Sequence, residues 1–103
     1  MAGVDEFTKD LQEYLNSFCW GVTWIRPGLD RRTRSLLTLA ILGATGKTSE
    51  LASHTRGALH NGCSTDEIKE VFLHLATYAG VPTAVEAFRA AQPIVSKSAD
   101  RAT

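Results

Sequence analysis

The chain has 103 residues, of which 44% are hydrophobic, and its eleven lysines and arginines balance eleven acidic residues. This length and composition are typical of one globular domain, so residues 1–103 are expected to form a single domain. The balanced charge argues against nucleic acid or an anionic membrane as a partner. The sequence contains no secretory leader pattern and no apolar stretch of membrane-spanning length, and we expect a cytoplasmic protein.

The first segment, residues 5–18, has helical spacing of its apolar side chains and is expected to end before Gly21. These apolar residues are Phe7, Leu11, Tyr14, Leu15 and Phe18. The following run, WGVTWIRPGL, holds two glycines, a proline and two tryptophans. It is expected to be a loop that packs against the domain as a lid or wall.

The second helix is expected to begin after Asp30, a candidate N-cap, and to run to about Thr45 before Gly46. Its middle, SLLTLAILGA, is apolar on nearly every side. A helix of this kind is either central to the domain or shared with another subunit, and the short chain favours sharing. We therefore expect a homo-oligomer.

A third helix over about residues 48–61 separates its side chains into three arcs at 3.6 residues per turn. The buried arc is expected to hold Leu51, Ala52, Thr55, Ala58 and Leu59. The arc away from the core holds Ser49, Ser53, Arg56 and His60. A stripe at the border between them holds Glu50, His54, Gly57 and Asn61. This border stripe is the most informative chemical pattern in the chain.

The last two helices have clear start and stop signals. Gly62 ends the third helix, and the sequence STDE from Ser64 is a capping box that opens the fourth. The fourth helix is expected to point Ile68, Phe72, Leu75 and Ala79 inward and to carry His74 and Tyr78 on another side. Gly80 ends it, and Pro82 fits the first turn of a fifth helix. The fifth helix is expected to carry Val85, Phe88 and Ala91.

Pro93 is expected to end or kink this fifth helix, and residues 96–103 are expected to form a disordered tail. The predicted fold class is therefore all-α, a compact domain of about five helices. Cys19 and Cys63 form neither a CxxC pair nor a set with metal-ligand spacing to the histidines. We expect reduced thiols, no metal and no cofactor.

Three segments, WGVTWIRPGLDRRTRSLLTLAILGATGK, ELASHTRGALHNG and EIKEVFLHLATYAGVPTAVEAF, resemble the decarboxylase branch of the carboxymuconolactone decarboxylase family. The resemblance covers about residues 18–88. It implies an alkylhydroperoxidase-like helical fold and a homo-oligomer, a trimer or hexamer. It also implies a carboxy-lyase of aromatic degradation, which removes carbon dioxide from gamma-carboxymuconolactone, or a similar lactone acid, to give beta-ketoadipate enol-lactone.

Alkylhydroperoxidase-type members of the wider superfamily carry a Cys-x-x-Cys-x-x-x-His motif. Here Lys47 and Glu50 stand at the two cysteine positions, while His54 keeps the histidine position. Without neighbouring thiols, peroxide reduction by dithiol exchange is not expected. The start of the chain is also shorter than the resemblance leads us to expect, and the roles of His60 and Cys63 stay open.

Glu50 and His54 lie one helical turn apart and are the candidate catalytic residues. A carboxylate can orient one ring nitrogen of a histidine and leave the other facing a pocket for acid–base chemistry. The alternative is that the two residues form an ordinary surface ion pair. The border stripe together with the resemblance favours the catalytic hypothesis.

Arg26 and Arg31 are candidates to bind the carboxylate that the substrate retains, because guanidinium pairs with carboxylate in a bidentate manner. Arg32 and Arg34 could serve the site or a subunit interface equally well. Trp24 is expected to shield the pocket from water. The remaining candidates, His74 and Tyr78, could donate hydrogen bonds to the lactone carbonyl or belong to an interface.

The leading hypothesis is thus a cofactor-independent decarboxylase acting on a small lactone acid, because the electron pair released with carbon dioxide can spread into the unsaturated lactone. One alternative is a member of the same family acting on a different lactone or enol acid. A second alternative is a non-catalytic helical oligomer or binding module. A thiol peroxidase partner is the third.

Overall fold

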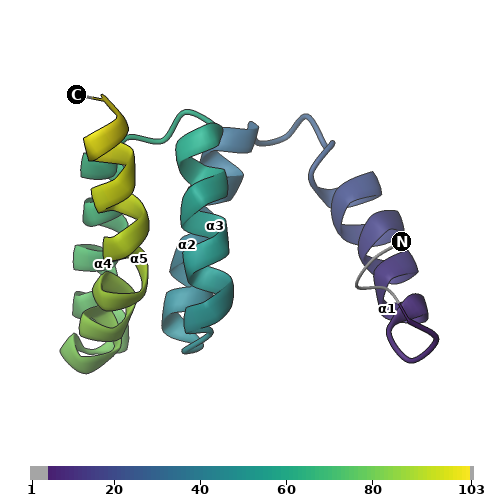
Figure 1. Ribbon diagram of the computed structural model, residues 1–103, viewed down its shortest axis with the longest axis horizontal. Helices are drawn as coiled ribbons and strands as arrows, with labels where there is room; N and C mark the ends of the chain where they lie inside the picture. Colours follow the sequence, from purple (N-terminus) through teal and green to yellow (C-terminus); the bar gives the residue numbers. More distant parts are fainter. Residues whose placement is uncertain (1–4, 103) are drawn as a thin grey trace. The chain divides into compact units, whose positions relative to one another are not determined.

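The computed structural model describes residues 5–102, and every regular element among them is a helix (Figure 1). The all-helical prediction is confirmed for this part of the chain. In chain order the elements are α1 (Lys9–Tyr14), η1 (Leu15–Thr23), α2 (Arg31–Ala44), α3 (Thr48–His60), α4 (Thr65–Ala79) and α5 (Val81–Ala102). Contacts group the chain into two compact units, Met1–Asp30 and Arg31–Thr103. The assignment of residues 1–103 to one domain stays a prediction.

The first unit begins with a turn that the periodicity had placed inside a helix. The Asp5 carboxylate accepts hydrogen bonds from the backbone N–H and the hydroxyl of Thr8, at 2.9 and 3.0 Å. These hydrogen bonds hold the pKa of Asp5 below its ordinary value, and the bond from the Thr8 backbone has the largest effect. Because Thr8 closes this turn, α1 starts only at Lys9.

The expected helix end before Gly21 is wrong, because the helix continues through this glycine to Thr23 as the wide-turned η1. The N–H of Trp24 donates to the carbonyl of Cys19 at 3.0 Å, five residues back, as in a π-helix. A Cβ at position 21 would lie 2.8 Å from the Asn16 carbonyl oxygen. Glycine therefore permits the close approach of successive wide turns here, and only the part of the predicted loop after Thr23 is non-helical.

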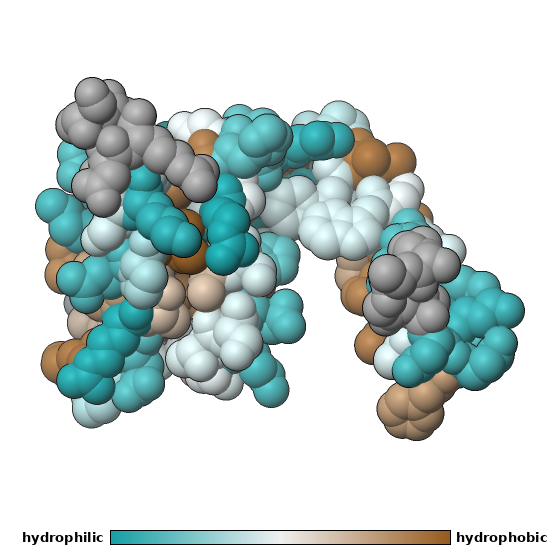
Figure 2. Space-filling model, in the orientation of Figure 1, coloured by the Kyte–Doolittle hydropathy of each residue, from teal (hydrophilic) through white to brown (hydrophobic). Residues whose placement is uncertain are grey.

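The apolar stripe of α1 and η1 is largely exposed. Figure 2 shows hydrophobic side chains along one side of this unit. Phe7 is 94% exposed, and Leu11, Tyr14 and Phe18 are each more than half exposed. Tyr14 and Phe18 contact each other, with ring centroids 4.8 Å apart. The stripe was predicted correctly, but other residues of the same unit leave it uncovered, and a lid or wall role stays a prediction.

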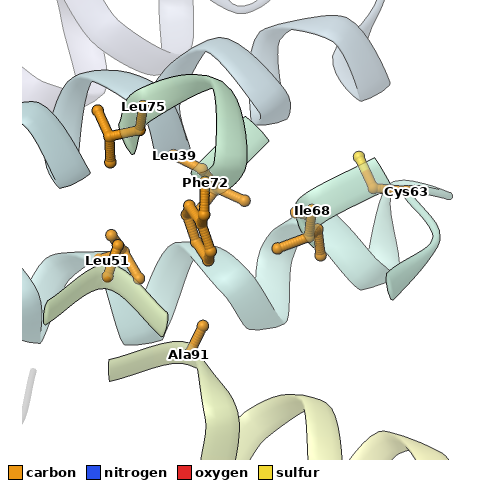
Figure 3. Packing of buried hydrophobic residues seen from close by; sticks show 9 residues of the cluster. Leu39, Leu51, Cys63, Ile68, Phe72, Leu75 and Ala91 are labelled. Carbon is orange, nitrogen blue, oxygen red and sulfur yellow. The ribbon is translucent and has the colours of Figure 1, made fainter. Parts of the chain in front are cut away.

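In the second unit, four helices run side by side (Figure 1). Helix α2 packs on α3 and α4, and α5 packs on the same two helices and, less extensively, on α2. The core between them consists of buried residues from all four helices and from Cys63, shown in part in Figure 3. The largest fully buried apolar side chains of this core are Phe72, Leu39, Leu51 and Ile68.

The arcs predicted for α3 are confirmed in part, because Ala52 and Leu59 of the expected buried arc are only half-buried and Glu50 of the border stripe is exposed. Leu51, Thr55 and Ala58 are buried, whereas Ser53, Arg56 and the rest of the outer arc are exposed. The predicted capping box of α4 is also present. Its two reciprocal hydrogen bonds join Ser64 and Glu67.

The inward face predicted for α4 needs one correction, and the inward face of α5 consists of small residues. Ala79, predicted to be buried, is exposed because it is the last residue of α4. On α5 the buried residues are Ala84, Ala87 and Ala91, whereas Val85 and Phe88 are 38% and 37% exposed. Alanines let α5 approach its neighbours closely, so the larger side chains are displaced to the edge of the contact.

Of the two alternatives predicted for Pro93, an end of the helix is wrong and a kink stays a prediction, and the predicted disordered tail is wrong for the described residues, since α5 continues through Pro93 to Ala102. Proline cannot donate the hydrogen bond that a helix directs to the carbonyl four residues earlier. Pro93 and Arg89 are both exposed, so water can satisfy that carbonyl. Thr103 lies outside the described residues.

Candidate functional site

The border stripe of α3 is the centre of the candidate site. Glu50 is exposed in the first turn of α3, where a negative charge is favourable near the positive end of the helix dipole. His54, Gly57 and Asn61 follow along the same side and are half-buried. The regular helix thus places Glu50 and His54 one turn apart, as their spacing predicts.

A hydrogen bond shows which neighbour this stripe faces. The side-chain Nδ2 of Asn61 donates to Oγ of Ser35 at 3.0 Å, and Ser35 is buried on α2. The stripe therefore lies on the α2 side of α3. Sequence spacing could not have shown this pair, since its members are 26 residues apart.

In residues 5–102, no hydrogen bond or ion pair joins Glu50 to His54. Both side chains are therefore available to a ligand. An i,i+4 pair of this kind can still meet by rotation of the glutamate side chain. The expected orientation of His54 by Glu50 remains a prediction for the substrate-bound state.

The arginines at the start of α2 have different surroundings. Arg32 forms an ion pair with Glu67 at the start of α4, and its carbonyl accepts a hydrogen bond from the Cys63 thiol at 3.4 Å. Arg32 thus has a structural partner within its own chain. Arg34 is half-buried, and Arg31 is exposed as the first residue of α2.

The Asn61–Ser35 hydrogen bond also shows how the antiparallel helices α2 and α3 are aligned, because it places Ser35 and Asn61 at about the same height along the helix axes. At about 1.5 Å rise per residue, Arg31 lies roughly 16 Å from His54 along the helix axes. Arg31 of the same copy can therefore reach a small acid bound at His54 only if the arginine side chain is extended. The structure does not bring these two predicted site residues into direct contact.

His74 and Tyr78 lie on a different side of α2 from the border stripe. Their rings contact each other with centroids 4.8 Å apart, and both line a largely apolar groove of about 1000 Å³ between α2 and α4. Leu37 and Ile41 contribute exposed apolar surface to the same groove. Neither Glu50 nor His54 lines it.

Trp24 and Arg26 belong to the first unit. Trp24 is half-buried and its ring centroid lies 5.6 Å from that of Trp20. Arg26 is exposed. Their predicted roles at a pocket stay predictions, because the first unit is a separate compact body.

Two further searches concern residues 5–102 alone. No three histidine, cysteine, aspartate or glutamate side chains there are grouped closely enough to hold a metal ion. No helix of that stretch combines the length and hydropathy needed to cross a membrane. Cys19 is half-buried and Cys63 buried, and neither forms a disulfide.

A family model described as the carboxymuconolactone decarboxylase family matches residues 9–93, a range that includes the border stripe and the groove. The chain belongs to this family. The sequence resemblance is thereby confirmed, and α3 with its Glu50 and His54 lies inside the matched region.

Three relatives show how this family member compares with known proteins. It is 42% identical over 94 residues to 4-carboxymuconolactone decarboxylase of Acinetobacter baylyi, covering 91% of this chain and 70% of that protein. It is 43% identical over 95 residues to nitrosuccinic acid decarboxylase of Metarhizium robertsii, covering 92% and 66%. It is 32% identical over 99 residues to an uncharacterized 15.0 kDa protein of Paracoccus denitrificans, covering 94% and 74%.

The chain thus spans about two thirds of the length of the relatives it matches. Two of these three relatives have names that state a reaction, and both names are those of decarboxylases. The comparisons support a decarboxylase of the carboxymuconolactone decarboxylase family, that is, a carboxy-lyase.

Proposed function

We propose that this chain removes carbon dioxide, without a cofactor, from a small acid whose reacting carbon can pass its electron pair to oxygen. The observation that carries the proposal is the border stripe of α3, where Glu50 and the half-buried His54 stand one turn apart within the region shared with the decarboxylase family. Both side chains are available to a ligand, as an acid–base site requires.

The substrates in the two relatives' names share a chemical core. In nitrosuccinate and in 4-carboxymuconolactone (gamma-carboxymuconolactone), the carbon that carries the departing carboxylate also bears a CH2–carboxylate arm and an electron-accepting group. That core is a succinate substituted at carbon 2. We propose substituted succinates of this kind as the substrate class, with the lactone as the first candidate and the acyclic nitro acid as the second.

The proposed reaction breaks the bond between the reacting carbon and the departing carboxylate. Its electron pair moves into the nitro group or into the unsaturated lactone, and carbon dioxide leaves. His54, in its protonated form, then returns a proton to carbon and is reprotonated from water. Glu50 stabilises the charged ring and orients it. The departing carboxylate itself should stay unpaired, because a cation bound to it would stabilise the ground state more than the transition state.

The other predicted site residues have proposed roles around the same substrate. Arg26 or Arg31 would bind the retained carboxylate arm, with Trp24 as a hydrophobic cover. His74 and Tyr78 would donate to the oxygen that gains charge. Because their groove lies on a different side of α2 from His54, we propose that a second copy brings the two faces together in a homo-oligomer, a trimer or hexamer.

The test is carbon dioxide release from each of the two acids by the purified protein, followed together with the product by NMR. His54→Ala should lower kcat by about a hundredfold or more. Glu50→Gln should lower it less. Ser53→Ala, on the exposed outer arc of the same helix, is the matched control and should keep parental turnover. No release from either acid would contradict the proposed function, and full activity of a folded His54→Ala would contradict the role of the histidine.

A further inference from the structure

Gly57 is the one glycine of α2 to α5 and their connections whose presence the fold does not explain. Gly46, Gly62 and Gly80 have φ angles of 73°, 94° and 102°, a backbone region that other residues rarely adopt. Gly43 lies against the core, since a Cβ there would lie 2.6 Å from Cδ2 of the buried Leu75 and that side chain would have to shift.

At Gly57 both reasons are missing. Its φ is not positive, and a Cβ built on it would meet no heavy atom within 4 Å. It nevertheless stands in the interior of a 13-residue helix, where glycine is the least favourable residue after proline. An alanine would fit the fold and strengthen the helix, so something outside the packed fold must favour the absence of a side chain.

The position of Gly57 points to a ligand. It follows His54 by one turn and precedes Asn61 by one turn on the border stripe, so its bare backbone is the gap between two polar side chains. Glycine is the usual residue where a ligand must approach the backbone closely.

We propose that Gly57 is a specificity-determining residue of the decarboxylase site, and that the body of the substituted succinate lies over its backbone while His54 faces the reacting carbon. This inference rests on the proposed function. Gly57 takes part in no chemical step. The absence of a side chain leaves room for the substrate, so the size of the residue at position 57 limits the size of the substrate that can bind.

The test uses Gly57→Ala and Gly57→Leu, with Ser53→Ala and Ser53→Leu as controls of equal size on the exposed arc of α3. Both Gly57 variants improve helix propensity, so the thermal midpoint should rise by about 2–8 °C for alanine. At the same time KM for 4-carboxymuconolactone or nitrosuccinate should rise in the order Gly, Ala, Leu, by about tenfold or more for leucine. The Ser53 variants should keep the parental KM.

Several results would overturn the inference. A lower thermal midpoint of Gly57→Ala would show that the fold itself needs the glycine. An unchanged KM in both Gly57 variants would show that no substrate lies there. An altered sedimentation coefficient with unchanged KM would assign the glycine to a contact between copies.

Titration calorimetry with the same two acids separates this inference from the proposed function. A parent protein that binds an acid without releasing carbon dioxide, and loses binding in Gly57→Leu, would contradict the proposed function and leave a ligand site at Gly57 without decarboxylation. A parent that turns over while the Gly57 variants match it contradicts the inference alone. A parent that neither binds nor turns over contradicts both.

Discussion

Glu67 has two separable roles at the start of α4, and three substitutions should resolve them. Its carboxylate accepts a hydrogen bond from the Ser64 N–H at 2.9 Å, while its own N–H donates to the Ser64 hydroxyl at 3.0 Å. The same carboxylate pairs with Arg32 at the start of α2. One residue therefore caps its own helix and joins it to a second one.

The expected losses of unfolding free energy follow from these contacts. Ser64→Ala removes the acceptor at the N-cap, which costs about 1 kcal/mol. Glu67→Gln keeps an oxygen for the Ser64 N–H but loses the charge. The two partners are 42% and 33% exposed, so the ion pair contributes about 0.2–1 kcal/mol. Glu67→Ala loses both interactions, about 1–2 kcal/mol in total.

Thermal unfolding followed by far-UV circular dichroism measures these losses, because about 1 kcal/mol shifts the midpoint of a domain near this size by roughly 4–8 °C. At about 1 M salt the Debye length falls to about 3 Å. The deficit of Glu67→Gln should then shrink, whereas that of Ser64→Ala should persist. Glu70→Gln, an exposed change on the same helix, is the control. Equal losses for Glu67→Gln and Glu67→Ala at high salt would refute the division of roles.

Three further outcomes follow from the site and its surface. Arg31→Ala should raise KM with little change in kcat, since it is assigned to a retained carboxylate; steady-state kinetics with a parental KM would return it to a structural role. Replacing Cys19 and Cys63 together by serine, and adding a chelator, should leave most turnover in a protein that stays folded, and a loss of turnover would point to thiol or metal chemistry. Ile41→Glu, at a groove position 62% exposed, should reduce self-association in sedimentation velocity, and an unchanged distribution would remove the groove from the interface.

The sequence predicted those parts of the fold that depend on local signals. The buried and outer arcs of α3 followed from helical periodicity because Leu51, Thr55 and Ala58 recur at helical spacing and the outer arc is plainly polar. The capping box at Ser64 is defined by residues three apart. Neither feature needs knowledge of another helix, which is why both are found where periodicity and capping rules place them.

Features that depend on packing could not be predicted in this way. The apolar residues of α5 do not show which of them are buried, because close helix contact favours Ala84 and Ala87 over the more hydrophobic Val85 and Phe88. Gly21 is a residue type that commonly ends a helix, yet the wide turns of η1 continue through it.

The same limit applies to the candidate site. Glu50 and His54 could be selected because one helix carries both residues. The position of Arg31 at the far end of α2, and the separation of His74 and Tyr78 from the stripe, depend on how the helices are arranged. Residues on different helices can be assigned to one site only after that arrangement is known.

The contact at Gly43 has a consequence for how this sequence can diverge. A methyl group there would overlap the Leu75 side chain and touch those of Leu51 and Ala87, so four positions from four helices share one fixed volume. Enlargement at any of them requires a smaller residue at another. Substitutions at positions 43, 51, 75 and 87 should accordingly be inherited in compensating sets, and a library that randomises these four together should yield more folded variants with glycine retained at 43 than with any larger residue there.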